Sequence, residues 1–260
     1  MDYQDIIVEV KGATAHITIN RPEVYNAFRG TTCDELIHAF QKAGWNNSIG
    51  VIVLAGAGDK AFCTGGDQSS HDGQYDGRGT IGLPVEELHT VIRDVPKPVI
   101  AKVQGYAIGG GNVLATICDL TIAGEDAQFG QVGPKMGSID PGFGTALLAQ
   151  IVGDKKAKEI WYMCRRYTAA EAQEMGLVNK VVPNDQLDAE VDAWCAELEQ
   201  RSPTAISIGK RSFNAATENI RGIANLGLEA LRLYYDSEES REGVNALAEK
   251  RKPDFRKYVK

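Results

Sequence analysis

The stretch GYAIGGGNVLATICDL, Gly105 to Leu120, follows the short apolar run KPVIAKVQ and places three glycines at the start of an apolar segment. A short apolar run bounded by turn residues is typical of a buried strand. Glycines at a strand end let the backbone turn sharply or come close to another group. The stretch therefore predicts a buried strand, a glycine turn and a helix that the glycines open.

A second glycine stretch, FCTGGDQ from Phe62 to Gln68, follows the apolar run IGVIVLAG. Neither glycine stretch has the GK[ST] ending of a phosphate-binding loop or the GxGxxG spacing of a dinucleotide site. Each offers backbone N–H groups at a strand end, and two such donors converging on one oxygen would stabilise a developing oxyanion. The alternative explanation for the glycines in both stretches is that they allow a helix to pack tightly against a strand.

Strand and helix patterns alternate through the first part of the chain. DIIVEV and AHITIN, separated by KGAT, predict a hairpin, TTCDELIHAFQKAG predicts a helix that starts at a Thr cap, and LPVEELHTVIRDV predicts one with Pro84 near its first turn. This alternation, which continues to about Val182, predicts an α/β core with buried sheets.

After KVVPNDQLD the strand signals stop. Helical periodicity covers 184–200, 202–216 and 220–250, with turns expected near Gly222 and Asp236. We expect this helical region to pack on the core or on a neighbouring subunit. The predicted division is a core over 1–200 that holds the binding site, and a C-terminal region over 201–260.

Composition excludes several functional classes. The net charge of −7 argues against a nucleic-acid-binding surface. No apolar run approaches the roughly 20 residues that span a bilayer, and the N-terminus lacks a secretory pattern, so a cytoplasmic protein without membrane contact is expected. The 5 cysteines lack CxxC pairs and the 4 histidines lack HxxxH spacing, which favours reduced thiols and no metal.

The stretch GQVGPKMGSIDPGFG, Gly130 to Gly144, contains one carboxylate, Asp140, among glycines and apolar residues. Asp-Pro-Gly is favourable turn chemistry, so Asp140 has a structural explanation. The apolar neighbours Ile139, Pro141 and Phe143 would also raise the pKa of a buried carboxyl, as a general base requires. The stretch by itself leaves both explanations open.

Five motifs in this order, INRPEVYNAF, AFCTGGDQ, GYAIGGGNVL, CDLTIA and FGQVGPKMGSIDPGFG, resemble the crotonase (enoyl-CoA hydratase/isomerase) superfamily over essentially the whole chain. The resemblance implies an α/β fold with a spiral ββα core and a helical C-terminal region that drives trimer formation. It also implies a coenzyme A thioester as substrate. The oxyanion-hole amides would be those of Gly66 and Gly110.

The chain departs from the hydratase pattern. The two hydratase glutamates would stand at the positions of Val113 and Gly133, so paired-glutamate addition of water is not expected. Asp140, with Ser138 before it, resembles instead the branch that contains 1,4-dihydroxy-2-naphthoyl-CoA synthases and 2-ketocyclohexanecarboxyl-CoA hydrolases. The branch's C-terminal tyrosine would be Tyr235.

Within that branch the residues favour a hydrolase that opens 2-ketocyclohexanecarboxyl-CoA to pimeloyl-CoA. Tyr25 stands where the synthases have arginine, Val132 replaces the threonine of QTGPK, and the loop SSHDGQYDGRGTIGLP is similar to that of the hydrolases. A synthase remains the alternative, because Gln131, Gly133 and Trp161 could still hold a small anion. A non-catalytic acyl-CoA or RNA binder is the alternative from another class.

The resemblance implies that Asp140 is the base, helped by Ser138, and that Tyr235 contacts the substrate or protonates the enolate. No metal or redox cofactor is implied, and the expected assembly is a trimer or a dimer of trimers. His71 and Tyr75 would line the ring pocket, while Lys250 and Phe255 would approach coenzyme A; Cys63 is expected to be a packing residue. The full set of implied substrate and coenzyme A contacts is Tyr25, Ala27, Thr64, Gly65, Asp67, Gln68, His71, Tyr75, Tyr106, Ile108, Lys250 and Phe255.

Overall fold

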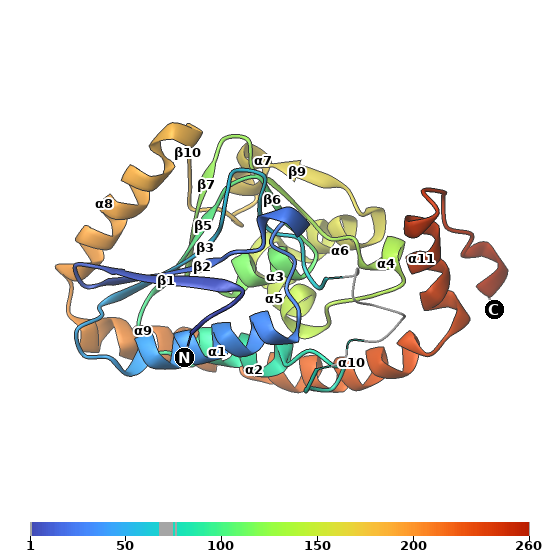
Figure 1. The fold of residues 1–260 in the computed structure, drawn as a ribbon, viewed down its shortest axis with the longest axis horizontal. Helices are drawn as coiled ribbons and strands as arrows, with labels where there is room; N and C mark the ends of the chain where they lie inside the picture. The colour runs from blue at the N-terminus through green and yellow to red at the C-terminus, as the bar shows by residue number, and fades with distance from the viewer. Residues whose placement is uncertain (1, 68–74, 76, 260) are drawn as a thin grey trace.

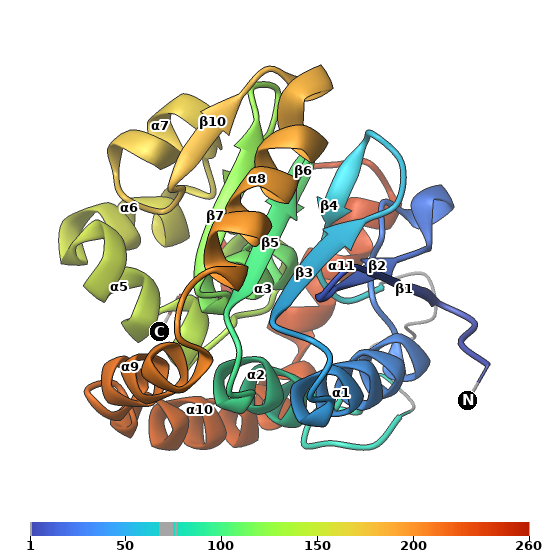
Figure 2. The ribbon, with the colours of Figure 1, turned by 90° about the vertical axis from the view of Figure 1, so that its left-hand side faces the viewer.

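The computed structural model describes residues 2–67, 75 and 77–259, and their strands form two sheets (Figures 1 and 2). Over these residues the larger sheet has six strands in the order β1-β2-β3-β5-β7-β10, and the smaller has four in the order β4-β6-β8-β9. The strands are β1 (Ile6–Lys11), β2 (Thr14–Ile19), β3 (Val51–Gly56), β4 (Ala61–Cys63), β5 (Val99–Val103), β6 (Tyr106–Ile108), β7 (Leu120–Gly124), β8 (Gln128–Gly130), β9 (Arg166–Thr168) and β10 (Lys180–Val182).

The larger sheet confirms the strands expected from the apolar runs. β1 and β2 form the predicted antiparallel hairpin, in which Ile6 pairs with Ile19 and Lys11 with Thr14. From β2 onward the neighbouring strands are parallel. β3 and β5 lie in the interior of this sheet and are buried on both faces, which explains their mostly apolar sequences; Lys102 of β5 is partly exposed and pairs with Asp188.

The smaller sheet positions the glycine stretches. Its strands β4, β6 and β8 are parallel neighbours, and β9 pairs antiparallel with β8. Because the carboxyl ends of parallel strands meet at one edge, the segments that follow these three strands are brought together. These segments are the TGGD stretch, the IGGGN stretch and the stretch that leads to Asp140.

Helices cover both faces of the larger sheet. α8 crosses one face (Figure 2), where Leu187, Val191 and Cys195 pack on apolar residues of β3, β5 and β7. The opposite face packs against α1 and α3 in the main core. The helices are α1 (Gly30–Trp45), α2 (Val85–Asp94), α3 (Gly110–Ile117), α4 (Gly133–Met136), α5 (Ala146–Val152), α6 (Asp154–Met163), α7 (Ala169–Glu174), α8 (Leu187–Glu199), α9 (Pro203–Ala215), α10 (Asn219–Tyr235) and α11 (Glu238–Ala248).

Two details of the helix predictions differ in the structure. The turn expected near Gly222 lies at 216–218, between α9 and α10, and Gly222 itself is inside α10; the chain breaks near Asp236 as expected. α1 begins at Gly30 with Arg29 as its N-cap, so Thr31 does not start it. Thr32 Oγ1 accepts a hydrogen bond from the Arg29 N–H and donates one to Asp5, and this local bonding moves the start of the helix.

The C-terminal helices pack on the same chain's core. α9 lies on the α2 side of the molecule (Figure 2), where Asn214 Nδ2 donates to the Arg93 carbonyl oxygen, and α10 packs on the turn Gly142–Gly144. α11 lies next to α4 at the far end of the molecule (Figure 1). The 5 cysteines are unpaired, and Cys164 is the one that is partly exposed. Across the described residues, no helix is long and apolar enough to cross a membrane. The same residues contain no cluster of His, Cys, Asp and Glu suited to a metal ion.

Candidate active site

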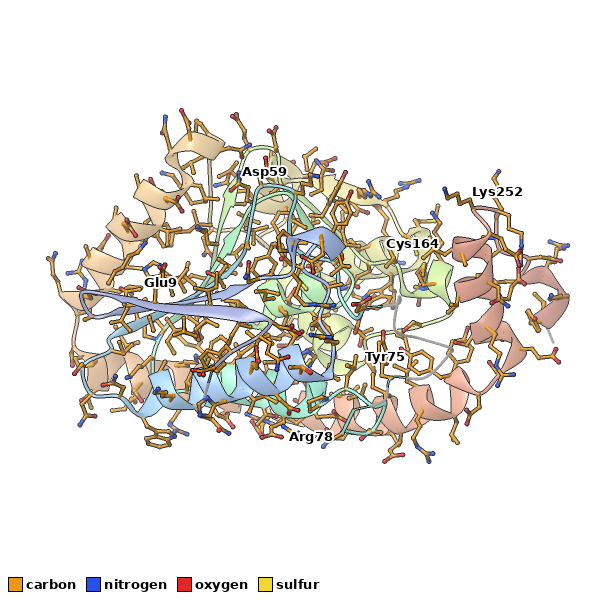
Figure 3. All side chains as sticks on the ribbon, viewed as in Figure 1. Glu9, Asp59, Tyr75, Arg78, Cys164 and Lys252 are labelled. Carbon is orange, nitrogen blue, oxygen red and sulfur yellow. The ribbon has the colours of Figure 1, made fainter. Side chains whose placement is uncertain are left out.

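A cavity of 410 Å³ opens where the two glycine stretches, the segment around Asp140 and the C-terminal helices meet. Figure 3 shows the side chain of Tyr75 in the region between the core and α10. The residues that line the cavity are Val24, Ala27, Phe28, Thr64, Gly65, Gly66, Asp67, Tyr75, Ile81, Leu83, Val85, Gly109, Gly110, Val132, Gly133, Met136, Ser138, Asp140, Leu231, Tyr235 and Leu247. This lining is mainly apolar.

The first glycine stretch is held in place by backbone pairing with Phe28. The Phe28 N–H donates to the Gly65 carbonyl oxygen at 2.8 Å, and the Asp67 N–H donates to the Phe28 carbonyl oxygen at 2.8 Å. Successive amides of an extended segment point in opposite directions, so the Gly66 N–H faces away from Phe28. Gly66 lines the cavity, so its backbone lies at the cavity wall.

A buried ion pair holds the end of the same stretch. Arg21 Nη2 lies 2.7 Å from Asp67 Oδ2, and both side chains are largely buried. Arg21 Nη1 also donates to the Ala27 carbonyl oxygen at 2.5 Å. Asp67 was predicted to bind substrate; it lines the cavity, but its charge is neutralised by Arg21. The pair therefore fixes the position of the amides that precede it.

The second amide belongs to Gly110, the first residue of α3. Gly109 has a φ of 58°, a backbone conformation that favours glycine. The first N–H groups of a helix have no partner within it, and the Gly110 N–H donates no hydrogen bond within the described chain. A Cβ added at Gly65 would lie 2.9 Å from Gly110 N, so the two stretches touch only because both lack side chains.

Asp140 lies in the segment between α4 and the turn Gly142–Gly144. A Cβ added at Gly144 would lie 2.8 Å from Asp140 Cβ and 3.0 Å from Val113 Cγ2, so Asp140 is close to apolar groups while it remains partly exposed in the cavity. Burial raises the pKa of Asp140 to about 6. No hydrogen bond or ion pair of the Asp140 carboxylate occurs within the described part of the chain. These properties suit a general base.

Ser138 and Tyr235 form a hydroxyl pair beside Asp140. Ser138 Oγ and Tyr235 Oη are 2.8 Å apart, and the two residues belong to the same chain. The pKa of Tyr235 is raised to about 12, mainly by burial, so the phenol is protonated at neutral pH. The ring of Tyr75 packs edge-on against Tyr235, with centroids 6.4 Å apart. The three predicted catalytic residues are thus brought together in one cavity.

The hydratase glutamate positions contain no carboxylate. Val113 is fully buried in the core. A Cβ added at Gly133 would meet the Ser138 carbonyl oxygen at 2.5 Å and Trp161 Cζ3 at 2.7 Å, which leaves no room for a longer side chain without rearrangement. The described lining contains two carboxylates, and Asp67 is paired with Arg21. Asp140 is therefore the one whose charge no described side chain neutralises.

Cys63 is not a candidate nucleophile. Its side chain is fully buried, and burial raises the pKa of its thiol to about 12. Reactive cysteines require the thiolate, which this environment disfavours. The predicted packing role of Cys63 agrees with this environment.

Other predicted contacts fall into three groups. Ala27, Thr64, Gly65 and Tyr75 line the cavity. Thr64 Oγ1 donates to the Tyr25 carbonyl oxygen, and Tyr25 and Tyr106 form an aromatic pair beside the cavity, with centroids 6.4 Å apart. Tyr25, Tyr106, Ile108, Lys250 and Phe255 are not among the described lining residues. Gln68 and His71 lie outside the described residues.

The residues predicted to hold a small anion differ in whether their hydrogen-bond donors already have a partner. Gln131 is 1% exposed, and both its amide oxygen and its amide nitrogen have no hydrogen-bond partner within the described chain. Trp161 Nε1 donates to the Gly144 carbonyl oxygen at 2.5 Å, so this N–H is already used. The Gly133 N–H, at the first residue of α4, also has no acceptor within the described chain, so the Gln131 amide and the Gly133 N–H are the donors left for an anion.

Several functional residues were missed by the sequence reasoning. Apolar lining residues come from distant segments, and Leu231 and Leu247 have the spacing of ordinary apolar helix positions. Two residues of α11 support the segment that leads to Asp140 from outside the cavity. Ser240 Oγ donates to the Gly137 carbonyl oxygen at 2.7 Å, and a Cβ added at Gly243 would lie 2.3 Å from the Met136 carbonyl carbon. No local motif marks these contacts.

Trp161 positions the segment that contains Asp140. Besides its bond to Gly144, its ring edge lies against Gly133, so it contacts both ends of this segment. Replacement of Trp161 by phenylalanine removes the hydrogen bond and keeps most of the ring. Because small displacements of a catalytic group reduce turnover strongly, we expect kcat to fall roughly ten- to 100-fold with a smaller change in KM.

Steady-state kinetics on the Trp161→Phe variant check this expectation. Trp194→Phe is the matched control, because the Trp194 indole donates to Glu190 on α8. Equal kcat values for the two variants would contradict the positioning role of Trp161.

Comparison with known proteins agrees with this geometry. Two sheets flanked by helices, with paired glycine amides at one strand edge, define a crotonase-type protein. The model of the enoyl-CoA hydratase/isomerase family matches residues 9–258. The chain therefore belongs to the enoyl-CoA hydratase/isomerase family, the crotonase superfamily, whose members process coenzyme A thioesters.

Solved structures support the same assignment. An enoyl-CoA hydratase from Mycobacterium avium subsp. paratuberculosis is 30% identical, with a TM-score of 0.87 and coverage of 98% of this chain and 99% of that chain. An enoyl-CoA hydratase/isomerase from Xanthobacter autotrophicus is 30% identical, with a TM-score of 0.84 and coverage of 95% and 94%. An enoyl-CoA hydratase/carnithine racemase from Magnetospirillum magneticum is 31% identical, with a TM-score of 0.77 and coverage of 98% and 96%.

Proposed function

We propose that this protein opens the ring of 2-ketocyclohexane-1-carboxyl-CoA by hydrolysis and forms pimeloyl-CoA. The observation that carries the proposal is the Asp140 carboxylate, which no described side chain neutralises and which shares a mainly apolar cavity with Gly66 and Gly110. The two neighbouring positions at which a hydratase would carry glutamates hold Val113 and Gly133. A single base beside an oxyanion hole suits water attack on a ketone followed by enolate formation.

The proposed reaction is a hydrolytic retro-Dieckmann cleavage. Asp140 takes a proton from water, and the hydroxide equivalent adds to the ring ketone carbon. The tetrahedral alkoxide collapses to a carboxylic acid, and the bond between the former ketone carbon and the thioester α-carbon breaks. The electron pair moves into the thioester, whose enolate oxygen accepts hydrogen bonds from Gly66 and Gly110. The proton that Asp140 took from water passes to the α-carbon, directly or through Tyr235, which regenerates the base and completes the reaction with coenzyme A still attached.

The hydroxyl pair has two roles in this proposal. Ser138 helps to position the water, and Tyr235 remains protonated, so it can donate to the substrate or protonate the enolate carbon. The thioester acts as the electron sink, so the proposed chemistry requires no metal or redox cofactor. A non-catalytic acyl-CoA binder would not need these two hydroxyls together with Asp140.

Product analysis by mass spectrometry tests the proposal. The protein is incubated with 2-ketocyclohexanecarboxyl-CoA and, separately, with o-succinylbenzoyl-CoA. Addition of one water to the first substrate with coenzyme A retained would support the proposal. Release of free coenzyme A would indicate thioester hydrolysis and reject it, and ring closure of the second substrate would assign the protein to the synthases.

The activity should depend on pH through Asp140. The base must be ionised, and its pKa is raised to about 6, so kcat/KM should fall as pH decreases through about 6. The pKa of Tyr235 is about 12, so loss of its proton should not reduce activity near neutral pH. Measurement of kcat/KM from about pH 5 to about pH 8 checks this dependence. A flat profile over that range would contradict an Asp140 base.

We also propose that the chain forms a homo-oligomer, either a trimer or a dimer of trimers, through its C-terminal region 201–260. Large apolar side chains on α9 and α10 support this proposal, since Phe213 is 81% exposed, Leu226 76% and Leu233 64% in the single chain. Apolar surface of this kind is typical of sites that another protein covers.

A further inference from the structure

The cavity contains negative charge but no described positive charge. Its described lining includes two carboxylates, Asp67 and Asp140, and no lysine or arginine. Asp67 is neutralised by Arg21, which lies behind the glycine stretch at 2.7 Å. The sequence of residues 68–76, QSSHDGQYD, also lacks lysine and arginine. Asp140 therefore sets the charge of the described cavity.

The groups packed around Asp140 do not compensate this charge. β4 contributes the Cys63 thiol and α10 the Tyr235 phenol, and burial keeps both protonated by raising their pKa values to about 12. Ser138 is neutral and is paired with Tyr235. The remaining neighbours, Val113 from α3 and Trp161 from α6, cannot ionise.

The titratable groups of α2 near the cavity, Arg93 and His89, contact the ring of Phe143 and not the Asp140 carboxylate. The Arg93 guanidinium lies over the Phe143 ring at 5.1 Å from its centroid, and His89 packs edge-on against the same ring. Burial lowers the pKa of His89 to about 4, so this imidazole is neutral at neutral pH. Burial, rather than another charge, accounts for the raised pKa of Asp140.

The uncompensated negative charge of Asp140 should discriminate between uncharged acyl groups and acyl groups that carry a carboxylate. An uncharged acyl chain or ring ketone meets an apolar wall and one carboxylate, whereas an acyl chain that ends in a carboxylate places a second negative charge beside the first. Two carboxylates that share a poorly solvated site repel each other strongly.

We propose that Asp140 is also a charge filter, which admits uncharged acyl groups and weakens the binding of acyl groups that end in a carboxylate. If the proposed function holds, the reaction itself creates such a carboxylate at the carbon that the water attacks. The filter would then retain the ring ketone and expel the opened product. It would also disfavour the reverse reaction, because the carboxylate substrate of ring closure would be repelled.

Binding titrations with two matched thioesters test the filter. Heptanoyl-CoA and pimeloyl-CoA have acyl chains of the same length, and the first ends in a methyl group where the second ends in a carboxylate. Wild-type protein at about pH 8, where Asp140 is ionised, should bind heptanoyl-CoA roughly ten- to 100-fold more tightly. Asp140→Asn should lose most of this preference. Ser138→Ala, which leaves the Asp140 charge, should keep it.

Each result has a definite meaning. If Asp140→Asn kept the same preference for heptanoyl-CoA, the apolar wall would be its cause and the filter would be overturned. Equal binding of both thioesters to wild-type protein would also overturn it. The product analysis described above separates this inference from the proposed function. Ring opening without a charge preference would reject the filter alone, and a charge preference without ring opening would reject the proposed function alone.

Discussion

Turnover of 2-ketocyclohexanecarboxyl-CoA is expected to fall roughly 100- to 10,000-fold when Asp140 is replaced by asparagine. Asparagine keeps the shape of the side chain and one acceptor oxygen, but it cannot take a proton from water. The cavity walls and the Gly66 and Gly110 amides are unchanged, so binding of the uncharged ring thioester should be nearly normal. Initial rates, a binding titration and circular dichroism separate loss of the base from loss of the fold.

Asp192→Asn is a suitable control for this experiment, because Asp192 is exposed on α8. This variant should keep wild-type turnover. If Asp140→Asn retained more than about a tenth of the wild-type rate, against the loss expected for a general base, Asp140 would be a turn residue. The search for the base would then move to His71.

Replacement of Gly110 by valine should reduce turnover roughly 100- to 1,000-fold, the loss that accompanies removal of one oxyanion donor. A Cβ at this position would lie 2.8 Å from Phe28 Cζ and 3.2 Å from Gly65 Cα. The branched side chain would therefore push the two glycine stretches apart and separate the amides of Gly66 and Gly110. Kinetics and circular dichroism on the same sample check the effect.

Two further variants make the oxyanion experiment interpretable. Gly110→Ala should fold more readily and show a smaller loss, because it adds the Cβ without the branch. Gly209→Ala on α9 is the control, since a Cβ there would meet nothing within 4 Å. Wild-type turnover in a folded Gly110→Val variant would mean that the glycines serve helix packing alone.

Four strands of the larger sheet, β1, β2, β3 and β5, could be predicted from the sequence, whereas β7, β10 and the smaller sheet were not. β3 and β5 are buried on both faces and therefore appear as mostly apolar runs. The four strands of the smaller sheet have three residues each, which is too short for a periodic pattern to be recognised. Their presence was marked only by the glycines that follow β4 and β6.

The candidate site was predictable where the chemistry lies in a local motif. Gly66, Gly110 and Asp140 stand in unusual surroundings that the sequence alone shows. The positioning of these groups depends on contacts between distant residues, such as the indole of Trp161 on Gly144, 17 residues away. Likewise, the pairing of Arg21 with Asp67 and the pairing of Tyr235 with Ser138 exist only after folding.

The unpaired Asp140 carboxylate also affects the stability of the fold. Because the pKa of this group is higher in the folded chain than its ordinary value of 3.8, folding favours the protonated form. The associated stabilisation is fully present below the ordinary pKa and is lost as pH rises through about 6. At neutral pH the ionised carboxylate lowers the free energy of unfolding by up to about 3 kcal/mol relative to a group with an unshifted pKa. In the proposed mechanism this ionised form is the base, so substitutions of Asp140 that raise thermal stability would lower turnover.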